Sequence, residues 1–151
     1  MKNKKPASHS LRKGRISLEN QIYLVTFITK DRKHRFLDFH CARVMIRRLK
    51  RTKHAKTLAF VIMPDHVHWL LQLLDETSLS RVLQTTKSAS AIQLNLHLKR
   101  QGKFWQDGFH DHAIRKEESV KDAARYIIAN PLRAGLVSNV RDYPHWDAIW
   151  L

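Results

Sequence analysis

The sequence AFVIMPDHVHWLLQL, residues 59–73, contains two apolar segments separated by Pro64-Asp65. Each segment is short and rich in β-branched, aromatic and leucine residues, which predicts strands over residues 57–63 and 66–74. The Pro-Asp pair predicts the turn that ends the first strand. This stretch therefore predicts two consecutive strands joined by a tight turn.

Strand and helix patterns continue on both sides of this pair. Residues 22–29 (IYLVTFIT) predict a further strand. Helix caps, a hairpin turn and a proline break give the remaining boundaries. The predicted elements are a helix from Asp38, a helix from Ser78 or Ser80 to about Leu98 that Gly102 ends, a hairpin over 104–115 with Gln106-Asp107-Gly108 as its turn, and a helix over 117–129 that ends at Asn130-Pro131.

The predicted order is β-α-β-β-α-β-α. It favours an α+β, ferredoxin-like (split βαβ) fold, in which an antiparallel sheet carries helices packed mainly on one face. The 151 residues fit one domain. We expect a basic N-terminal arm over 1–18, a single folded domain over 19–151, and no further domain after Trp146.

Positive charge is concentrated in the first part of the chain. The sequence has 28 Lys and Arg against 13 Asp and Glu, a formal charge of +15. Residues 1–60 contain 17 of these cations and three acids, which gives +14. Such a clustered excess favours a polyanionic partner, most often nucleic acid, over a merely solvated surface.

Composition also excludes several classes of protein. The four glycines form no phosphate-binding loop, so a nucleotide cofactor is not expected. Cys41 is the only cysteine, which excludes a disulfide scaffold or a zinc cluster built from cysteines and suits the cytoplasm. The sequence shows no secretory signal and no apolar run long enough to cross a membrane.

Two histidines lie in the strand predicted over 66–74. Because side chains alternate along a strand, His66 and His68 share one face. The residues that point the other way fit the core; they are Val67, Trp69, Leu71 and Leu73. Two imidazoles at this spacing are able to bind one metal ion, although such a pair also occurs by coincidence.

The last predicted helix presents a tyrosine away from its packing face. Its apolar stripe consists of Val120, Ala123, Ala124, Ile127 and Ile128. Tyr126 lies outside the stripe, and Asn130 follows it one helical turn later. Tyr126 is suited to act as a nucleophile and Asn130 as an oxygen ligand. The alternatives are a tyrosine at the edge of the core and an ordinary helix-terminal asparagine.

Three motifs together resemble a known family. Residues 59–73 resemble the motif of the HUH single-strand DNA endonucleases, in which an apolar residue separates two histidines. FWQDGFHDHAIR (104–115) and ARYIIANPLRAGLV (124–137) resemble the next two motifs of the transposases with one catalytic tyrosine. The order of the motifs is similar to that of the REP-associated tyrosine transposases, although His110 stands where that family often has an aromatic residue.

The resemblance implies a mechanism for the domain over 19–151. His66, His68 and Asn130 would hold a divalent ion, Mg²⁺ or Mn²⁺, that polarises the scissile phosphate. Tyr126 would attack phosphorus, forming a covalent 5′-phosphotyrosine and freeing a 3′-hydroxyl. The resemblance leaves the general base, and the choice between monomer and homodimer, open.

The implied partner is single-stranded DNA with a hairpin beside the cleavage site, in the cytoplasm and at the nucleoid. The cations expected to bind DNA are Arg12, Lys13, Arg15, Arg47, Arg48, Arg51, Arg115 and Arg133. Trp105, Phe109 and Trp146 are able to stack on bases, but burial is the stronger expectation for the first two. A non-catalytic single-strand binder and a nuclease that activates water remain alternatives.

Overall fold

The computed structural model describes residues 20–150, apart from the side chains of residues 117 and 118. The predicted arm over 1–18 lies outside the described residues. The elements are β1 (Ile22–Ile28), η1 (Lys30–Arg32), η2 (Arg35–Leu37), α2 (Phe39–Lys50), β2 (Ala55–Ile62), β3 (His66–Leu73), α3 (Leu79–Leu98), β4 (His110–Ile114), α4 (Glu117–Ile128), α5 (Asn130–Arg133), η3 (Val140–Asp142) and β5 (Trp146–Ala148).

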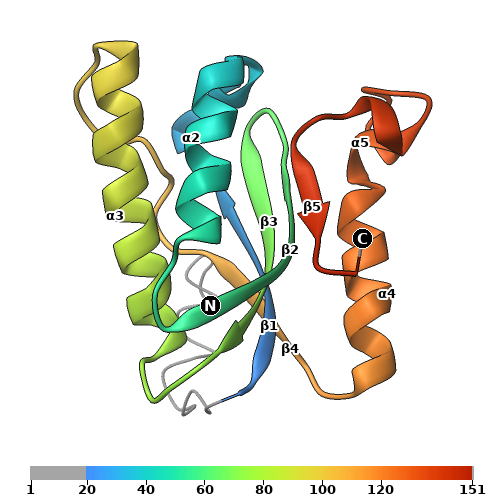
Figure 1. Cartoon of the computed structure of the whole chain (residues 1–151). Helices are drawn as coiled ribbons and strands as arrows, with labels where there is room; N and C mark the ends of the chain where they lie inside the picture. Colours follow the sequence, from blue (N-terminus) through green and yellow to red (C-terminus); the bar gives the residue numbers. More distant parts are fainter. Residues whose placement is uncertain (1–19, 151) are drawn as a thin grey trace.

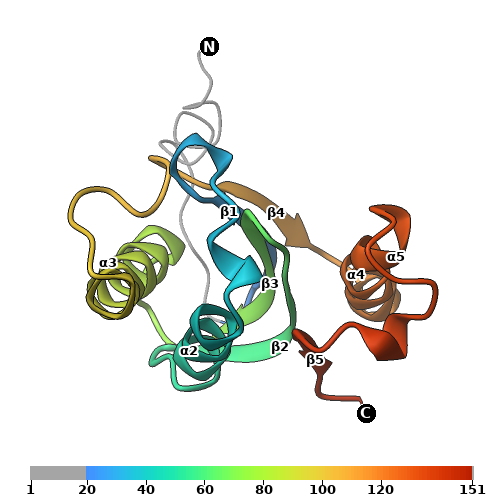
Figure 2. The same cartoon turned by 90° about the horizontal axis from the view of Figure 1, so that it is seen from above.

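The strands form one antiparallel sheet in the order β4-β1-β3-β2-β5. The first four strands and helices α2 and α3 form the predicted split βαβ core, and both helices lie on the same face of the sheet (Figures 1 and 2). The α+β, ferredoxin-like class is therefore confirmed. Helix α4 follows β4 and covers the opposite face (Figure 2).

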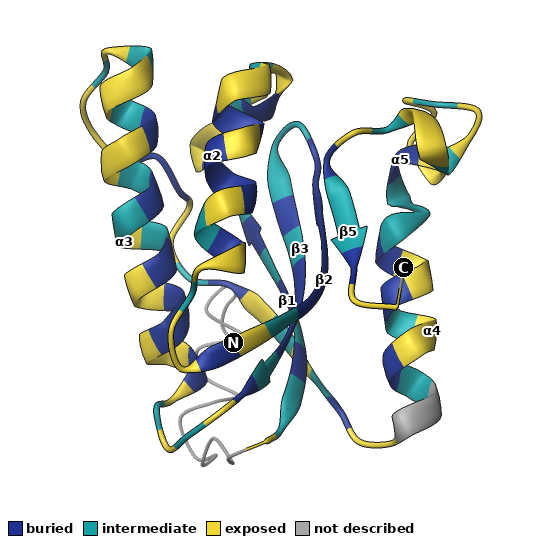
Figure 3. Cartoon of the chain, in the orientation of Figure 1, coloured by how far each residue is buried: buried dark blue, intermediate teal, exposed yellow. Residues whose placement is uncertain are grey.

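Two hydrophobic cores result, one on each face of the sheet. The larger core joins the sheet to α2 and α3 and includes Phe27, Met45, Trp69 and Leu83. The smaller core joins the sheet to α4; its members include Leu70, Ala124 and Ile127. The buried stripes of the helices in Figure 3 face the sheet, while their outer sides are exposed. In β3, residues of alternate parity therefore belong to opposite faces: Val67 and Trp69 lie in the larger core, and Leu70 lies in the smaller one.

Side-chain caps confirm the predicted starts of α2 and α3. The Asp38 carboxylate accepts a hydrogen bond from the backbone N–H of Cys41 (3.0 Å), and the Ser78 hydroxyl accepts one from that of Arg81 (3.1 Å). Both side chains satisfy donors that lack a partner in the first helical turn. The end of α3 differs from the prediction, because Lys99 takes the left-handed position (φ 55°) and Gly102 follows in the loop.

The predicted hairpin over 104–115 is wrong. Trp105 forms a bridge with Thr29, and β4 pairs with β1 rather than with the segment before it. Burial explains the difference: Trp105 packs against Phe27, with ring centroids 4.8 Å apart, and Phe109 is buried too. These aromatic contacts outweigh the local preference of Asp-Gly for a hairpin turn.

The C-terminal part contains three elements beyond the prediction, which are α5, η3 and β5. Helix α4 ends at Ile128, close to the expected boundary, but α5 starts at once with Asn130 and Pro131 at its beginning. Proline fits there because the first helical residues lack intrahelical acceptors. Strand β5 then pairs with β2. Over residues 20–150, no helix has the length and apolar character that a membrane span requires.

Candidate functional site

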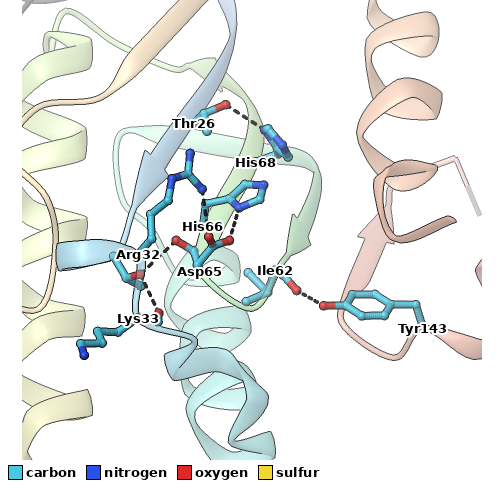
Figure 4. Close-up of polar contacts among 9 residues, drawn as sticks. Thr26, Arg32, Lys33, Ile62, Asp65, His66, His68 and Tyr143 are labelled. Atoms are coloured by element: carbon cyan, nitrogen blue, oxygen red, sulfur yellow. Dashed lines mark hydrogen bonds and ion pairs between the residues drawn. The ribbon is translucent and has the colours of Figure 1, made fainter. Parts of the chain in front are cut away.

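The paired histidines lie on the face of the sheet that α4 covers. His66 and His68 come from the start of β3, and their ring centroids are 4.8 Å apart (Figure 4). Leu70 has the same parity in β3 and belongs to the same hydrophobic cluster as Ala124 of α4. The strand alternation predicted from the sequence thus brings both imidazoles to one side.

A carboxylate orients His66. Its Nδ1 lies 2.6 Å from Oδ1 of Asp65, while Oδ2 of Asp65 accepts a hydrogen bond from Arg32 at 2.9 Å (Figure 4). Burial alone would raise the pKa of Asp65, but the hydrogen bonds from His66 and Arg32 hold it below its usual value. An ionised Asp65 keeps the proton of His66 on Nδ1, which leaves the lone pair of Nε2 unused.

A hydroxyl orients His68. Its Nδ1 lies 2.8 Å from Oγ1 of Thr26, the residue that pairs with it on β1. Burial, with smaller contributions from His66 and Arg133, lowers the pKa of His68 to about 4. His68 is therefore neutral near pH 7. When Nδ1 donates to Thr26, the lone pair of Nε2 is available.

These donors fit a divalent cation. Both histidines use Nδ1 for contacts within the protein and leave Nε2 for a ligand, as metal-binding histidines usually do. Asn130 begins α5, and its amide oxygen lies 3.4 Å from a nitrogen of Arg133, which itself contributes to the low pKa of His68. Nitrogen and oxygen ligands of this kind suit Mn²⁺ and also Mg²⁺ when a phosphate completes the coordination.

Tyr126 is presented to solvent from α4. It is 62% exposed, whereas Ala124 and Ile127 beside it are buried against the sheet. The guanidinium of Arg133 lies over its ring, 3.9 Å from the centroid. Figure 1 places the α4–α5 junction and the start of β3 at the same end of the molecule. Tyr126 thus lies on the histidine side of the sheet and outside the packing stripe, as predicted.

The other two tyrosines are poorly suited to nucleophilic attack. Tyr23 is buried in the core on the opposite face of the sheet. The hydroxyl of Tyr143 donates to the carbonyl of Ile62 at 2.5 Å (Figure 4), and burial raises the pKa of Tyr143 to about 12. Among the three tyrosines, all of which lie within the described residues, only Tyr126 is exposed.

Comparison with known families gives an independent result. The family model described as "Transposase IS200 like" matches residues 17–130, about three quarters of the chain. The chain belongs to this family. The match includes β3, with both histidines, and extends through Tyr126 to Asn130.

Relatives of this IS200-like transposase agree with the resemblance seen in its motifs. The chain is 27% identical over 138 residues to a Haemophilus influenzae protein provisionally named a REP-associated tyrosine transposase, covering 82% of this chain and 77% of the relative. It is also 27% identical over 134 residues to the REP-associated tyrosine transposase of Escherichia coli K12, covering 86% and 78%.

A solved structure confirms the fold. It is a REP-associated tyrosine transposase bound to a REP hairpin, with a TM-score of 0.72 and 24% sequence identity. The match covers 97% of this chain and 82% of the other. At this identity the likeness establishes the architecture, an α+β fold with an antiparallel sheet.

The cations predicted to bind DNA are spread over the IS200-like transposase. Arg47 and Arg51 are exposed on or just after α2, and Arg48 is half-buried and donates to Gln93 at 2.8 Å. Arg115 and Arg133 are exposed at the two ends of the segment that contains α4. Arg12, Lys13 and Arg15 lie outside the described residues.

Of the aromatic residues considered for base stacking, two are structural. Trp105 and Phe109 are buried, and the indole N–H of Trp105 donates to Ser90. Trp146 is half-buried and donates to the carbonyl of Val140. Base stacking by Trp105 and Phe109 is therefore excluded in this conformation, in agreement with the stronger expectation for both.

Sequence reasoning missed the residues that orient the histidines. Asp65 directly precedes His66, so its place in the motif is a signal that was available. Thr26 is 42 residues away from His68, and only the register between β1 and β3 identifies it. Arg32 is 33 residues away from Asp65 in the sequence, and it lies at the end of η1, just after β1.

Proposed function

We propose that this IS200-like transposase is a metal-dependent endonuclease and strand transferase for single-stranded DNA. It cleaves next to a DNA hairpin through a covalent 5′-phosphotyrosine on Tyr126. One observation carries the proposal. His66 and His68 both use Nδ1 for a contact within the protein, and they lie on the sheet face that α4, the helix of the exposed Tyr126, covers. Residues 19–151 form the catalytic domain in this proposal.

His66, His68 and Asn130 hold the divalent ion, Mg²⁺ or Mn²⁺. When bound, such an ion polarises and orients the scissile phosphate. Asp65 and Thr26 keep the two imidazoles in the tautomer and orientation that present Nε2. Because the pKa of His68 is about 4, this ligand needs no deprotonation near pH 7.

Tyr126 is the nucleophile. Its phenol oxygen attacks phosphorus, the bond from phosphorus to the 3′-oxygen breaks, and the departing oxygen takes up a proton as a 3′-hydroxyl. The new phosphotyrosine keeps the phosphodiester energy, so a 3′-hydroxyl of another strand reverses the step without ATP. Arg133 stacks on the tyrosine ring and adds positive charge near the reacting phosphate.

DNA binds through the clustered cations. The arm over 1–18 and the exposed face of α2 neutralise phosphates with Arg12, Lys13, Arg15, Arg47, Arg48 and Arg51, and Arg115 and Arg133 contact the strand near Tyr126. A related protein has been solved bound to a REP hairpin. We extend hairpin binding to this chain on that basis and on its positive charge.

A covalent trap tests the proposal. Single-stranded DNA with a hairpin is labelled at its 3′ end, incubated with protein and Mn²⁺, and denatured before electrophoresis. A 5′-phosphotyrosine joins the protein to the labelled fragment, so we expect a band of protein-linked DNA. Cleavage without this band would indicate a nuclease that activates water. Binding without cleavage would indicate a non-catalytic single-strand binder.

A further inference from the structure

A second group of metal-binding side chains lies on the other face of the sheet, between α2 and α3. Ligand atoms of Asp38, Cys41 and His97 all lie within 4.8 Å of one another. Asp38 and Cys41 belong to the start of α2, and His97 lies in the last turn of α3. The proposed cleavage site uses none of these residues.

The three side chains converge on one carboxylate. Oδ2 of Asp38 lies 3.1 Å from Nε2 of His97, and its other oxygen caps α2. The pKa of the Cys41 thiol is raised to about 12, chiefly by burial and then by Asp38, so the thiol is protonated in the metal-free protein. The contacts therefore bring one carboxylate oxygen, one sulfur and one imidazole nitrogen together.

These donors match the preferences of zinc. Zn²⁺ takes sulfur, imidazole nitrogen and carboxylate oxygen ligands in tetrahedral sites, and three protein ligands leave one position for water. His97 is exposed while Cys41 is fully buried, so an ion enters from the His97 side. A site with a single thiolate also agrees with the absence of a multi-cysteine cluster.

We propose that Asp38, Cys41 and His97 bind one zinc ion, which links the start of α2 to the end of α3. Zinc replaces the thiol proton, which passes to solvent, and His97 presents the lone pair of Nε2 with its remaining proton on Nδ1. The carboxylate of Asp38 and the thiolate of Cys41 neutralise the two charges of the ion. This site is separate from the proposed cleavage site and independent of the proposed function.

Cobalt provides a direct probe of this site. Co²⁺ adopts zinc geometries, and a cobalt–thiolate bond absorbs in the near-ultraviolet. Because Cys41 is the only cysteine of the chain, that band reports this site alone. We expect the reduced full-length protein to develop the band when Co²⁺ is added and to lose it when Zn²⁺ is added. Absence of the band at saturating Co²⁺ overturns the proposal.

Two variants supply the controls. His97→Gln changes an exposed residue and removes one ligand, so we expect the cobalt dissociation constant to rise by about tenfold or more. His54→Gln is the matched control, since His54 is an exposed histidine paired with Asp75 at 2.6 Å, with no cysteine in the pair. It should bind cobalt as the parent does. Equal affinity in His97→Gln and the parent overturns the proposal.

A third variant separates this site from the cleavage site. The double variant His66→Ala/His68→Ala should keep the thiolate band with unchanged affinity, because those histidines lie on the opposite face of the sheet. Loss of the band in this variant would overturn the assignment. The readout needs no DNA, so failure of the proposed cleavage mechanism does not affect it.

Discussion

The guanidinium carbon of Arg133 lies 3.9 Å from the centroid of the Tyr126 ring, and Nη2 of the same residue donates to the backbone carbonyl of Tyr126 at 2.7 Å. One side chain of α5 therefore holds both the ring and the backbone of the proposed nucleophile. Arg133 also contributes to the low pKa of His68. The positive charge of Arg133 therefore acts on both the ring of Tyr126 and the imidazole of His68.

This contact predicts that Arg133→Lys slows cleavage. Lysine keeps the charge but loses the planar group that stacks on the ring, so Tyr126 is less well positioned. We expect the single-turnover rate of adduct formation to fall about tenfold to a hundredfold, with little change in DNA affinity. Arg115→Lys is the matched control. An unchanged rate in Arg133→Lys would show that the stacked geometry has no role in catalysis.

Tyr126→Phe should abolish the covalent adduct and leave DNA binding nearly intact. Only the phenol oxygen is removed, and Tyr126 is exposed, so packing changes little. Tyr143→Phe is the control: it loses the hydrogen bond to Ile62 and about 1 kcal/mol of stability but should still cleave. Adduct formation is followed on denaturing gels, and cleavage by Tyr126→Phe would refute the nucleophile assignment.

Asp65→Asn and Thr26→Val should weaken metal binding without removing a ligand. Each variant frees the Nδ1 side of one histidine, so the imidazole is no longer held with Nε2 toward the ion. We expect the dissociation constant for Mn²⁺ to rise about 10–100-fold, measured by paramagnetic resonance on the DNA-free protein. Asp75→Asn breaks a similar contact with His54 and should have no effect. Equal affinities in all variants would contradict the metal assignment.

Features of this fold that depend on neighbouring residues could be predicted from the sequence, whereas features that depend on distant residues could not. Caps at Asp38 and Ser78, strand alternation in β3 and the outward position of Tyr126 depend on neighbouring residues, and the sequence predicted them. The prediction of a hairpin over 104–115 was wrong because Trp105 packs against Phe27, which is far away in the sequence. Strand β5 has only three residues, which is too short for an alternation of apolar and polar side chains to indicate a strand.

In the proposed site, too, the sequence indicated some residues, while others depend on contacts between distant parts of the chain. The residue types and their motif order indicated His66, His68, Tyr126 and Asn130, and their roles stay predictions. The Thr26 contact depends on strand register, and the stacking of Arg133 depends on how α5 turns back on α4. The cluster of Asp38, Cys41 and His97 requires the tertiary packing of two helices. None of these is a local property of the sequence.

Removal of residues 1–18 should reduce the salt dependence of DNA binding. This segment contains six Lys and Arg, and each phosphate contact on single-stranded DNA contributes about 0.7 to the slope of log K against log salt. The slope should therefore fall by at most about 4. The full-length variant Arg12→Gln/Lys13→Gln/Arg15→Gln, with a decrease of at most about 2, separates charge from chain length. An unchanged slope would mean that the segment does not contact phosphates.

His145→Phe should make the fold less sensitive to acid. Burial, then Arg43, lowers the pKa of His145, so the unfolded chain takes up this proton first as the pH falls. Because of His145, the free energy of unfolding decreases as the pH falls below about 6.5, and His145 has no such effect at higher pH. Phenylalanine keeps the ring contacts with Phe39 and Tyr143 and removes a buried Nδ1 that lacks a partner in the described residues.

Urea unfolding at about pH 7.5 and about pH 5.5 measures this effect. The drop in unfolding free energy between the two conditions should be smaller for His145→Phe than for the parent. Tyr143→Phe, which leaves His145 in place, should keep the larger drop. Equal drops in the parent and in His145→Phe would show that His145 does not titrate with folding.

The two outer strands of the sheet also bear on how the protein avoids aggregation. Strand β5 has three residues and β4 has five, so each offers few unpaired backbone groups to another chain. The first residues of β4 are His110, Asp111 and His112, which are polar and disfavour dry edge-to-edge contact. Short, polar edges are a common protection against sheet extension between molecules. The central strand with its histidines is thereby shielded on both sides without a closed barrel.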